Sequence, residues 1–340
     1  MFDFLPFFTV LVGFIVTFIS GYFVIPFLKK LKFGQTIRDE GPKWHEAKSG
    51  TPTMGGIMMF FGLVIAIVFS LIVSFATSGK LSMEFENSIR SSHWIAAFGL
   101  AVGMGAIGFV DDFIKVVKKR NLGLTARQKT FAQLIISATY LIVLLFSGMT
   151  STYIPFIGYV NIISGAGLIF WPIALFFVYG FTNAVNLTDG VDGLASSVTL
   201  VVCCALMIIA GYGSFRGANM LAAAGAGVCG GFLMWNAHPA KVFMGDTGSM
   251  MLGGLVVGLS FAVGAPILLI LAGIIYLLEA FSVMLQVAYY KKTKKRIFKM
   301  TPIHHHFEMS GWSEEKIVLV FSVVTLIGGL LAVLLDTLAR

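Results

Sequence analysis

The sequence predicts an all-α polytopic membrane protein with about ten transmembrane helices. Of its 340 residues, 57% are hydrophobic and only 12% are charged, and the mean hydropathy is +0.90. Soluble domains carry about twice that charged fraction, so a water-soluble enzyme is excluded. Apolar stretches of about 20 residues recur along the chain, and this length crosses ~30 Å of hydrocarbon as a helix. The alternating ten-residue segments of an outer-membrane barrel are absent.

Glycine, proline and charged residues divide the chain into ten apolar segments. The predicted spans are 5–28, 52–75, 94–114, 131–147, 166–183, 194–212, 218–235, 248–263, 266–290 and 317–337. After the fourth span, aromatic and β-branched residues surround Pro155 and Gly158, which predicts a small extracytoplasmic hairpin near 152–163. We interpret residues 1–340 as a single integral-membrane catalytic domain.

The distribution of lysine and arginine predicts which side of the membrane each loop faces. The odd-numbered loops hold 20 of the 24 basic residues, and only Lys80, Arg90, Arg216 and Arg340 lie elsewhere. The positive-inside rule then places the odd loops in the cytoplasm and both termini outside. A net charge of +8 also suits a nucleic-acid-binding protein, but here the bilayer explains it, and we expect membrane lipids and no nucleic acid as partners.

Most of the polar residues that are able to take part in catalysis or binding lie in these odd loops or at the adjoining helix ends. A transport pathway needs polar groups through the depth of the bilayer, or paired interrupted helices in two matching halves. The sequence has no clear repeat of that kind. One-sided clustering therefore favours chemistry at the cytoplasmic surface over transport.

The third span ends in two adjacent carboxylates, Asp111 and Asp112, with Lys115 within one helical turn. One aspartate at this position would suit an intrahelical ion pair. Two neighbouring aspartates repel each other, and the C-terminal end of a helix favours cations. The pair therefore indicates a functional site.

The fifth loop, residues 183–194, contains Asn186, Asp189 and Asp192 among glycines and has no basic residue to balance them. A polar turn that caps the next helix needs one such residue, so a binding role is favoured. The spacing does not identify the ligand, because short Asp and Gly strings also occur in calcium loops and ordinary turns.

The seventh loop ends in FMGDTGS, residues 243–249, which places Asp246 directly before an apolar helix. Asp246 is either a functional carboxylate or a helix N-cap, and Phe243 is either a ligand contact or an interfacial anchor. Five cytoplasmic-side aspartates require counter-charge, and Mg²⁺ with oxygen ligands supplies it economically if phosphate is present. Nearby lysines and histidines complete a pattern typical of phosphoryl transfer.

Three further segments contribute candidates. Residues 43–56 offer Lys48 and Thr53 before a glycine pair at a helix start, which suits phosphate or plain helix packing. The ninth loop joins a basic run at 291–299, which fits anionic lipid headgroups at least as well as substrate, to three consecutive histidines at 304–306. Glu279 lies within a span, where an acid must face protein or a polar groove, and it has no assigned role.

These motifs, in order, resemble the phospho-N-acetylmuramoyl-pentapeptide transferase family of the polyprenyl-phosphate N-acetylhexosamine-1-phosphate transferase superfamily. The resemblance rests on KSGTPTMGG (48–56), GFVDDFIK (108–115), NLTDGVDGL (186–194), FMGDTGS (243–249) and PIHHHFE (302–308). The aspartate motifs are shared by the superfamily, and the last string is typical of the muramoyl-pentapeptide branch.

The resemblance implies transfer of phospho-MurNAc-pentapeptide from UDP-MurNAc-pentapeptide to undecaprenyl phosphate, giving lipid I and UMP in peptidoglycan synthesis, with Mg²⁺ as cofactor and a homodimeric assembly. It implies catalytic roles for Asp111, Asp112, Lys115, Asp246, His304, His305 and His306, and a metal site at Asp246 and Asn186. The substrate-binding residues that it implies are Lys48, Thr53, Lys129, Asn186, Asp189, Asp192, Asn236, Phe243, Ser249 and Gln286.

The family proposal that Asp111 acts as a general base has a physical limit. A phosphate monoester has a second pKa of ~6, so most of it is already dianionic at pH 7 and a base adds little. We therefore expect charge positioning by Asp111 to matter at least as much as base catalysis. Two other hypotheses remain open: a transporter or lipid flippase whose carboxylates bind cations, and a related transferase that uses UDP-N-acetylglucosamine.

Overall fold

The computed structural model describes residues 4–31, 50–78, 88–117 and 123–339 and confirms a helical membrane protein. The first four helices are α1 (Leu5–Lys30), α2 (Gly56–Ser78), α3 (Ser88–Val117) and α4 (Ala126–Phe146). They are followed by β1 (Ser151–Ile154), β2 (Gly158–Asn161), η2 (Gly165–Ile169), α5 (Phe170–Thr188), α6 (Leu194–Tyr212) and α7 (Arg216–Asn236). The chain ends with α8 (Gly245–Ala262), η3 (Pro266–Leu268), α9 (Leu269–Ala272), α10 (Ile274–Thr293), α11 (Ile303–Glu308) and α12 (Glu314–Ala339).

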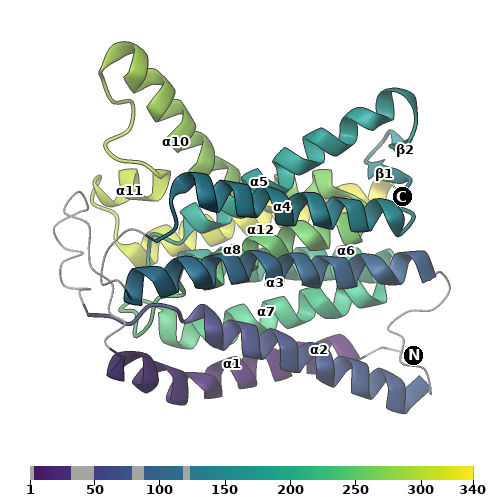
Figure 1. Cartoon of the computed structure of the whole chain (residues 1–340), viewed down its shortest axis with the longest axis horizontal. Helices are drawn as coiled ribbons and strands as arrows, with labels where there is room; N and C mark the ends of the chain where they lie inside the picture. Colours follow the sequence, from purple (N-terminus) through teal and green to yellow (C-terminus); the bar gives the residue numbers. More distant parts are fainter. Residues whose placement is uncertain (1–3, 32–49, 79–87, 118–122, 340) are drawn as a thin grey trace.

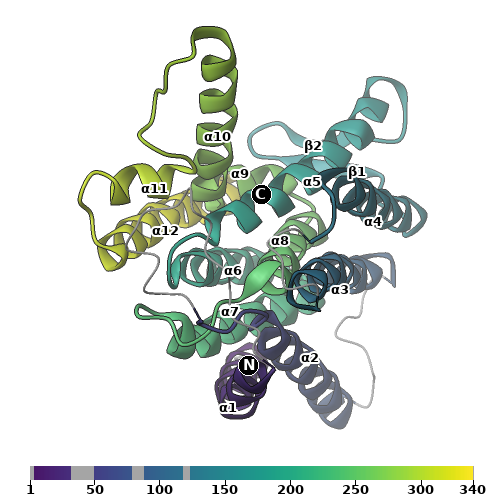
Figure 2. The ribbon, with the colours of Figure 1, turned by 60° about the vertical axis from the view of Figure 1, so that its left-hand side comes forward.

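Each of the ten predicted spans corresponds to a helical segment. Among the described residues, eight helices are long and apolar enough to cross a membrane, or nine if α9 and α10 with their preceding turn form one broken span. The segment outside this set is α8, in which every residue from Thr247 to Ala262 is buried. It is enclosed by other helices (Figure 2), so protein and not lipid surrounds it. Its several glycines allow these helices to pack closely against it, and they also lower its hydropathy.

The ninth predicted span is wrong as one continuous helix. The chain bends by 80° between the segment 266–272 and α10, at Gly273. Bends often occur at glycine, because a residue without a side chain has more backbone freedom and stabilises a regular helix less than other residues do. As a result α10 leaves the bundle, and both views show it standing away from the other helices (Figures 1 and 2).

The predicted hairpin is present as an antiparallel pair, with Ser151 opposite Asn161 and Ile154 opposite Gly158. It lies at one end of the bundle, whereas α11 and the C-terminal end of α3 lie at the other (Figure 1). The start of α1 and the end of α12 share the hairpin end, as an even number of spans requires.

The core of the bundle is the long contact between α3 and α8. Small residues let the two backbones approach closely: a Cβ on Gly254 would lie 2.8 Å from the carbonyl oxygen of Leu100. Close packing of small residues is the usual way helices associate in a membrane. Large apolar side chains such as Phe23, Phe146 and Phe176 instead lie on the outside, more than half exposed, where lipid would cover them.

Candidate active site

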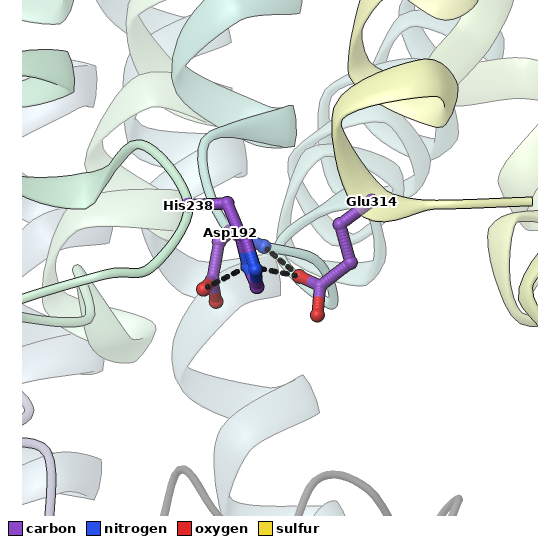
Figure 3. Close-up of side chains that lie close together, drawn as sticks. All are labelled: Asp192, His238 and Glu314. Atoms are coloured by element: carbon purple, nitrogen blue, oxygen red, sulfur yellow. Dashed lines mark hydrogen bonds and ion pairs between the residues drawn. The ribbon is translucent and has the colours of Figure 1, made fainter.

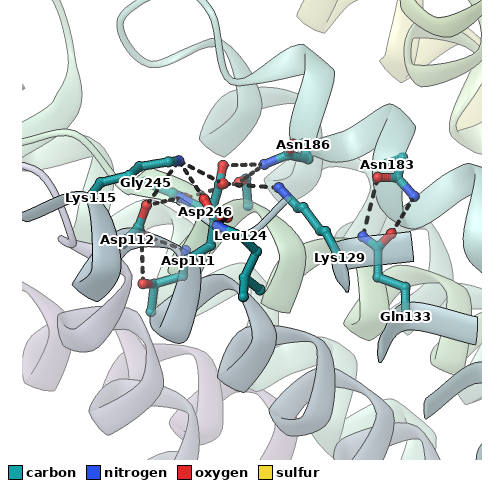
Figure 4. Close-up of polar contacts among 12 residues, drawn as sticks. Asp111, Asp112, Lys115, Leu124, Lys129, Gln133, Asn183, Asn186, Gly245 and Asp246 are labelled. Atoms are coloured by element: carbon teal, nitrogen blue, oxygen red, sulfur yellow. Dashed lines mark hydrogen bonds and ion pairs between the residues drawn. The ribbon is translucent and has the colours of Figure 1, made fainter. Parts of the chain in front are cut away.

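Three aspartates from two distant segments converge where α3 ends and α8 begins (Figure 4). Carboxylate oxygens of Asp111, Asp112 and Asp246 all lie within 4.8 Å of one another. The packing of α3 against α8 causes this convergence. At Gly108, one turn before the aspartate pair, a side chain would overlap the carbonyl group of Asp246, so glycine permits the approach.

Asp112, and not Asp246, caps the N-terminus of α8. Its carboxylate accepts hydrogen bonds from the backbone N–H of Asp246 at 3.2 Å, from that of Thr247 at 2.9 Å, and from the Thr247 hydroxyl at 2.7 Å. Carboxylates are favoured there because the first N–H groups of a helix lack intrahelical partners. Asp112 is 3% exposed. Because Asp112 on α3 accepts these N–H groups, the side chain of Asp246 does not have to cap its own helix and makes other contacts.

Two lysines neutralise much of this charge. The Nζ of Lys115 lies 2.6 Å from Asp111 Oδ2, 2.9 Å from Asp246 Oδ2 and 3.7 Å from Asp112 Oδ1. Lys129, from the first turn of α4, lies 2.9 Å from the same oxygen of Asp246. Figure 4 shows the two lysines reaching Asp246 from opposite sides. Three carboxylates facing two ammonium groups leave one negative charge, a balance that suits a cation and a phosphate binding together.

The end of α5 completes the network around Asp246. Asn186 donates from Nδ2 to Asp246 Oδ1 at 2.9 Å and to Ser249 Oγ at 2.7 Å, and Ser249 in turn donates to the carbonyl oxygen of Gly245. The predicted metal residues Asp246 and Asn186 are therefore neighbours. Asn186 turns its amide NH₂ toward the carboxylate, so it orients Asp246 in this arrangement.

Asp189 follows α5 and has no hydrogen bond to its carboxylate from any residue in the described part of the chain. Burial raises the pKa of Asp189 well above its usual range, and the negative charges of Asp246, Asp112 and Asp192 raise it further. A carboxyl group in this position benefits from a nearby cation.

Asp192 lies in a second cluster, where it meets two residues that the sequence analysis did not select (Figure 3). Its Oδ2 lies 3.1 Å from His238 Nδ1 and accepts the N–H of Ala240 at 3.0 Å. Glu314, at the start of α12, accepts the N–H of Asp192 at 3.1 Å and lies 3.7 Å from His238 Nδ1. These three side chains also have ligand types that metals accept. Only Asp192 carried a sequence signal, because His238 and Glu314 stand outside any repeated acidic pattern.

The loop between α7 and α8 is fixed by backbone and side-chain bonds. Phe243 donates its N–H to the carbonyl oxygen of Pro52 at 2.9 Å, and Gly55 donates back to Phe243 at 2.8 Å. Asn236, 2% exposed, accepts from Gly193 N–H at 3.1 Å and donates to the carbonyl oxygen of Val242 at 2.9 Å. Thr53 lies in the paired segment before α2, whereas the predicted Lys48 lies outside the described residues.

The three histidines begin α11 and have three different partners. His304 faces Glu279, His305 Nδ1 contacts Glu308 Oε2, and His306 Nδ1 accepts the N–H of Lys299 at 3.2 Å. The predicted Gln286 is 9% exposed and binds the backbone of Ile297 and Phe298, so its amide closes the loop after α10.

Seven of the predicted residues are joined by direct contacts into one network: Asp111, Asp112, Lys115, Lys129, Asn186, Asp246 and Ser249. Missed members are Thr247, which holds Asp112, and Leu124, whose N–H binds Asp111 at 2.8 Å. Gln133 and Asn183, a reciprocal amide pair between α4 and α5, were also missed because lone amides in apolar helices give no spacing signal.

Comparisons with known proteins identify the family of the chain. A family model described as glycosyl transferase family 4 matches residues 94–264. The phospho-N-acetylmuramoyl-pentapeptide-transferase of Listeria monocytogenes serovar 1/2a is 47% identical over 328 residues, 96% of each chain. Its namesakes from Caldicellulosiruptor bescii and Halalkalibacterium halodurans are 45% identical over 323 residues and 41% identical over 329, covering 95% and 96% of each chain. At this identity over nearly the whole length, the chain belongs to the phospho-N-acetylmuramoyl-pentapeptide-transferase family, a family of membrane-bound transferases of peptidoglycan synthesis.

Proposed function

We propose that this protein transfers phospho-MurNAc-pentapeptide from UDP-MurNAc-pentapeptide to undecaprenyl phosphate, forming lipid I and UMP, at the cytoplasmic face of the bacterial plasma membrane. The observation that carries the proposal is the convergence of Asp111, Asp112 and Asp246 with Lys115 and Lys129 at the end of a helical bundle. The names of the relatives support the transferase class. The cytoplasmic orientation rests on the excess of lysine and arginine in the loops at this end.

The donor set fits Mg²⁺, which prefers carboxylate oxygens together with substrate phosphates. Asp246 is the residue that we expect to hold the ion, with Asn186 beside it and Asp111 and Asp112 close by. When bound, Mg²⁺ would act as a Lewis acid that neutralises charge on the reacting phosphates. The two lysines contact Asp246 in this structure, so they must exchange part of that contact for phosphate oxygens.

The reaction joins an oxygen of the lipid phosphate to the sugar-bound phosphorus of the nucleotide sugar, and the bond to UMP breaks. We expect Lys115 and Lys129 to stabilise the charge on the two anionic reactants. We expect Phe243 to stack on a nucleobase, and its backbone bonds to Pro52 and Gly55 support a fixed position for it.

Asp111 is better suited to hold Lys115 than to remove a proton. One of its oxygens lies 2.6 Å from the lysine ammonium and the other accepts the N–H of Leu124. A phosphate monoester with a second pKa of ~6 is already mostly dianionic at pH 7, so removing its last proton adds little to the rate. We therefore assign Asp111 to charge positioning.

The test is UMP release by the purified protein in detergent, supplied with UDP-MurNAc-pentapeptide and undecaprenyl phosphate, with and without Mg²⁺. We expect release that needs both the lipid and the metal, and a loss of at least about 100-fold in Asp246→Asn, as is typical for removing a group that stabilises transition-state charge. Release with UDP-N-acetylglucosamine instead would reassign the sugar. Flux across sealed vesicles without a lipid-linked product would identify a transporter.

The homodimer is a separate proposal that rests on the family resemblance. Sedimentation of the detergent-solubilised protein would test it, and a monomeric mass for active protein would contradict it.

A further inference from the structure

A buried acid in α10 has no part in the mechanism above. Glu279 is the sixth residue of this helix and is 0% exposed. An ionisable side chain enclosed within a membrane-spanning helix is unfavourable unless a specific partner compensates for its lost hydration. The partner in this structure is His304, which is also 0% exposed and comes from α11.

Glu279 contacts His304 at two points. The carboxylate oxygen Oε1 lies 3.0 Å from Nδ1 of the ring, and Oε2 accepts the backbone N–H of the same residue at 3.5 Å. The carboxylate therefore constrains both the start of α11 and the orientation of the imidazole. The side-chain contact has ion-pair distance without the geometry of a hydrogen bond, and the negative charge of the carboxylate beside Nδ1 favours the ring form in which Nδ1 carries the proton.

The opposite edge of the His304 ring faces the acidic loop that follows α5. Both ring nitrogens are buried, and neither has a hydrogen-bond partner in the described part of the chain; Nδ1 lies beside the Glu279 carboxylate, and on the opposite edge lies Nε2. A side chain on Gly190 would overlap this nitrogen, so the ring edge rests directly against the backbone between Asp189 and Val191. A buried polar atom without a partner is unfavourable, which makes Nε2 a candidate for a ligand contact.

We infer that Glu279 is a positioning residue for substrate binding: it holds Nδ1 of His304 so that Nε2 is presented at the Asp189–Gly190 turn, where it exchanges a hydrogen bond with a polar group of the nucleotide sugar. This inference rests on the proposed function. Carboxylates that orient a functional histidine in this way set which ring nitrogen is free and where it points. Glu279 itself does not touch the substrate.

The experiment compares Glu279→Gln, His304→Ala and the double variant in the UMP-release assay. Outer partners of functional histidines typically contribute 10–100-fold, so we expect Glu279→Gln to lower kcat/KM for the nucleotide sugar by about that factor. The KM for undecaprenyl phosphate should stay unchanged. Because Glu279 acts through His304, the double variant should be no worse than His304→Ala, since residues that act as a unit are not additive.

Asp336→Asn is the matched control, since it removes the charge of another acid that is 0% exposed, near the far end of α12. It should retain wild-type kcat/KM. A second pair of variants avoids changing α10: glutamine places its terminal amide near the position of Nε2, where the amide oxygen can accept a hydrogen bond as unprotonated Nε2 does, and asparagine places its amide near that of Nδ1. His304→Gln should therefore keep more activity than His304→Asn.

The outcomes separate the two proposals. If the wild-type protein releases no UMP, the proposed function fails and this inference fails with it. If the wild-type protein is active, the inference alone is overturned by any of three results: wild-type kcat/KM in Glu279→Gln, losses that multiply in the double variant, or His304→Asn outperforming His304→Gln.

Discussion

At the scale of single residues, the site is an arrangement in which each aspartate has its own contacts. Asp112 caps α8, Asp111 holds Lys115, and Asp246 is shared between two lysines and Asn186. The carboxylate of Asp189 has no such partner among the residues that the structure describes. Chemically identical side chains are thereby assigned different tasks by the groups that surround them.

Thr247→Val tests the contact that secures Asp112. The hydroxyl donates to the carboxylate at 2.7 Å, and a hydrogen bond to a charged acceptor contributes about 1.5–3 kcal/mol, so we expect kcat to fall by roughly 10- to 150-fold. The rate of UMP release measures the effect. Thr325→Val is the control, because among the described residues the buried hydroxyl of Thr325 bonds a carbonyl oxygen of its own helix, at 2.7 Å, and no other group. An equal kcat in the two variants would contradict the assignment.

Asp189→Asn tests the cost of an uncompensated carboxylate. Because its pKa is raised in the folded state, Asp189 contributes stability below its unfolded pKa of ~3.9, and this contribution is lost as the pH rises toward the folded value. With metal removed by chelation, the variant should gain roughly 2 °C in thermal midpoint over the wild type at pH 8 and less at pH 5. A gain that is larger at pH 5 would show the opposite sign of the pKa shift.

At the scale of elements, short connections carry the site. The loop between α7 and α8 contains Phe243 and leads into Asp246, and it is bonded to the segment before α2 and to the start of α6. Helix packing sets the positions of α3 and α8, whereas these loop bonds set the positions of side chains between them. A loop that carries functional residues needs such support, because its own backbone has no regular ladder.

Asn236→Ala tests this support. The buried amide satisfies Gly193, Ser196 and Val242, and leaving such groups unpaired should lower the free energy of unfolding by roughly 2–4 kcal/mol. Thermal unfolding in detergent measures it. Asn161→Ala is the matched control, since Asn161 also takes part in three hydrogen bonds but is exposed, so water replaces them. Equal losses in both variants would contradict a special role for the buried loop.

At the scale of the whole molecule, the two ends of the bundle differ in chemistry. One end carries the aspartates, the histidines of α11 and the basic run after α10, and the other carries the uncharged hairpin (Figure 1). This asymmetry is expected of an enzyme that draws a water-soluble nucleotide sugar from one side and a lipid from the membrane.

Cysteine labelling tests the orientation. With Cys203, Cys204 and Cys229 replaced by serine, we expect Ile157→Cys in the hairpin to react with a membrane-impermeant maleimide on cells whose plasma membrane is intact. Lys295→Cys should react only after that membrane is permeabilised. Both positions are exposed in the structure, so access to the reagent is limited by the membrane alone. The reverse pattern would place the site outside.

The sequence alone determined the helical class, the approximate bounds of the spans, the hairpin and several of the residues that lie together in the candidate site. Hydropathy and charge suffice for these features because the bilayer imposes a length on every span and a position on every charge. Runs such as 108–115 and 243–249 also showed a candidate site, since each places an acid at the end of an apolar segment.

Only the tertiary structure decided how those residues are used. The cap of Asp112 on α8, the contact of Asp192 with His238 and Glu314, and the pairing of Glu279 with His304 each join different helices or loops. The bend at Gly273 likewise depends on how neighbouring helices pack. Local patterns describe how each segment meets lipid and water, whereas contacts between distant segments follow from side-chain packing across the whole bundle, which no local pattern encodes.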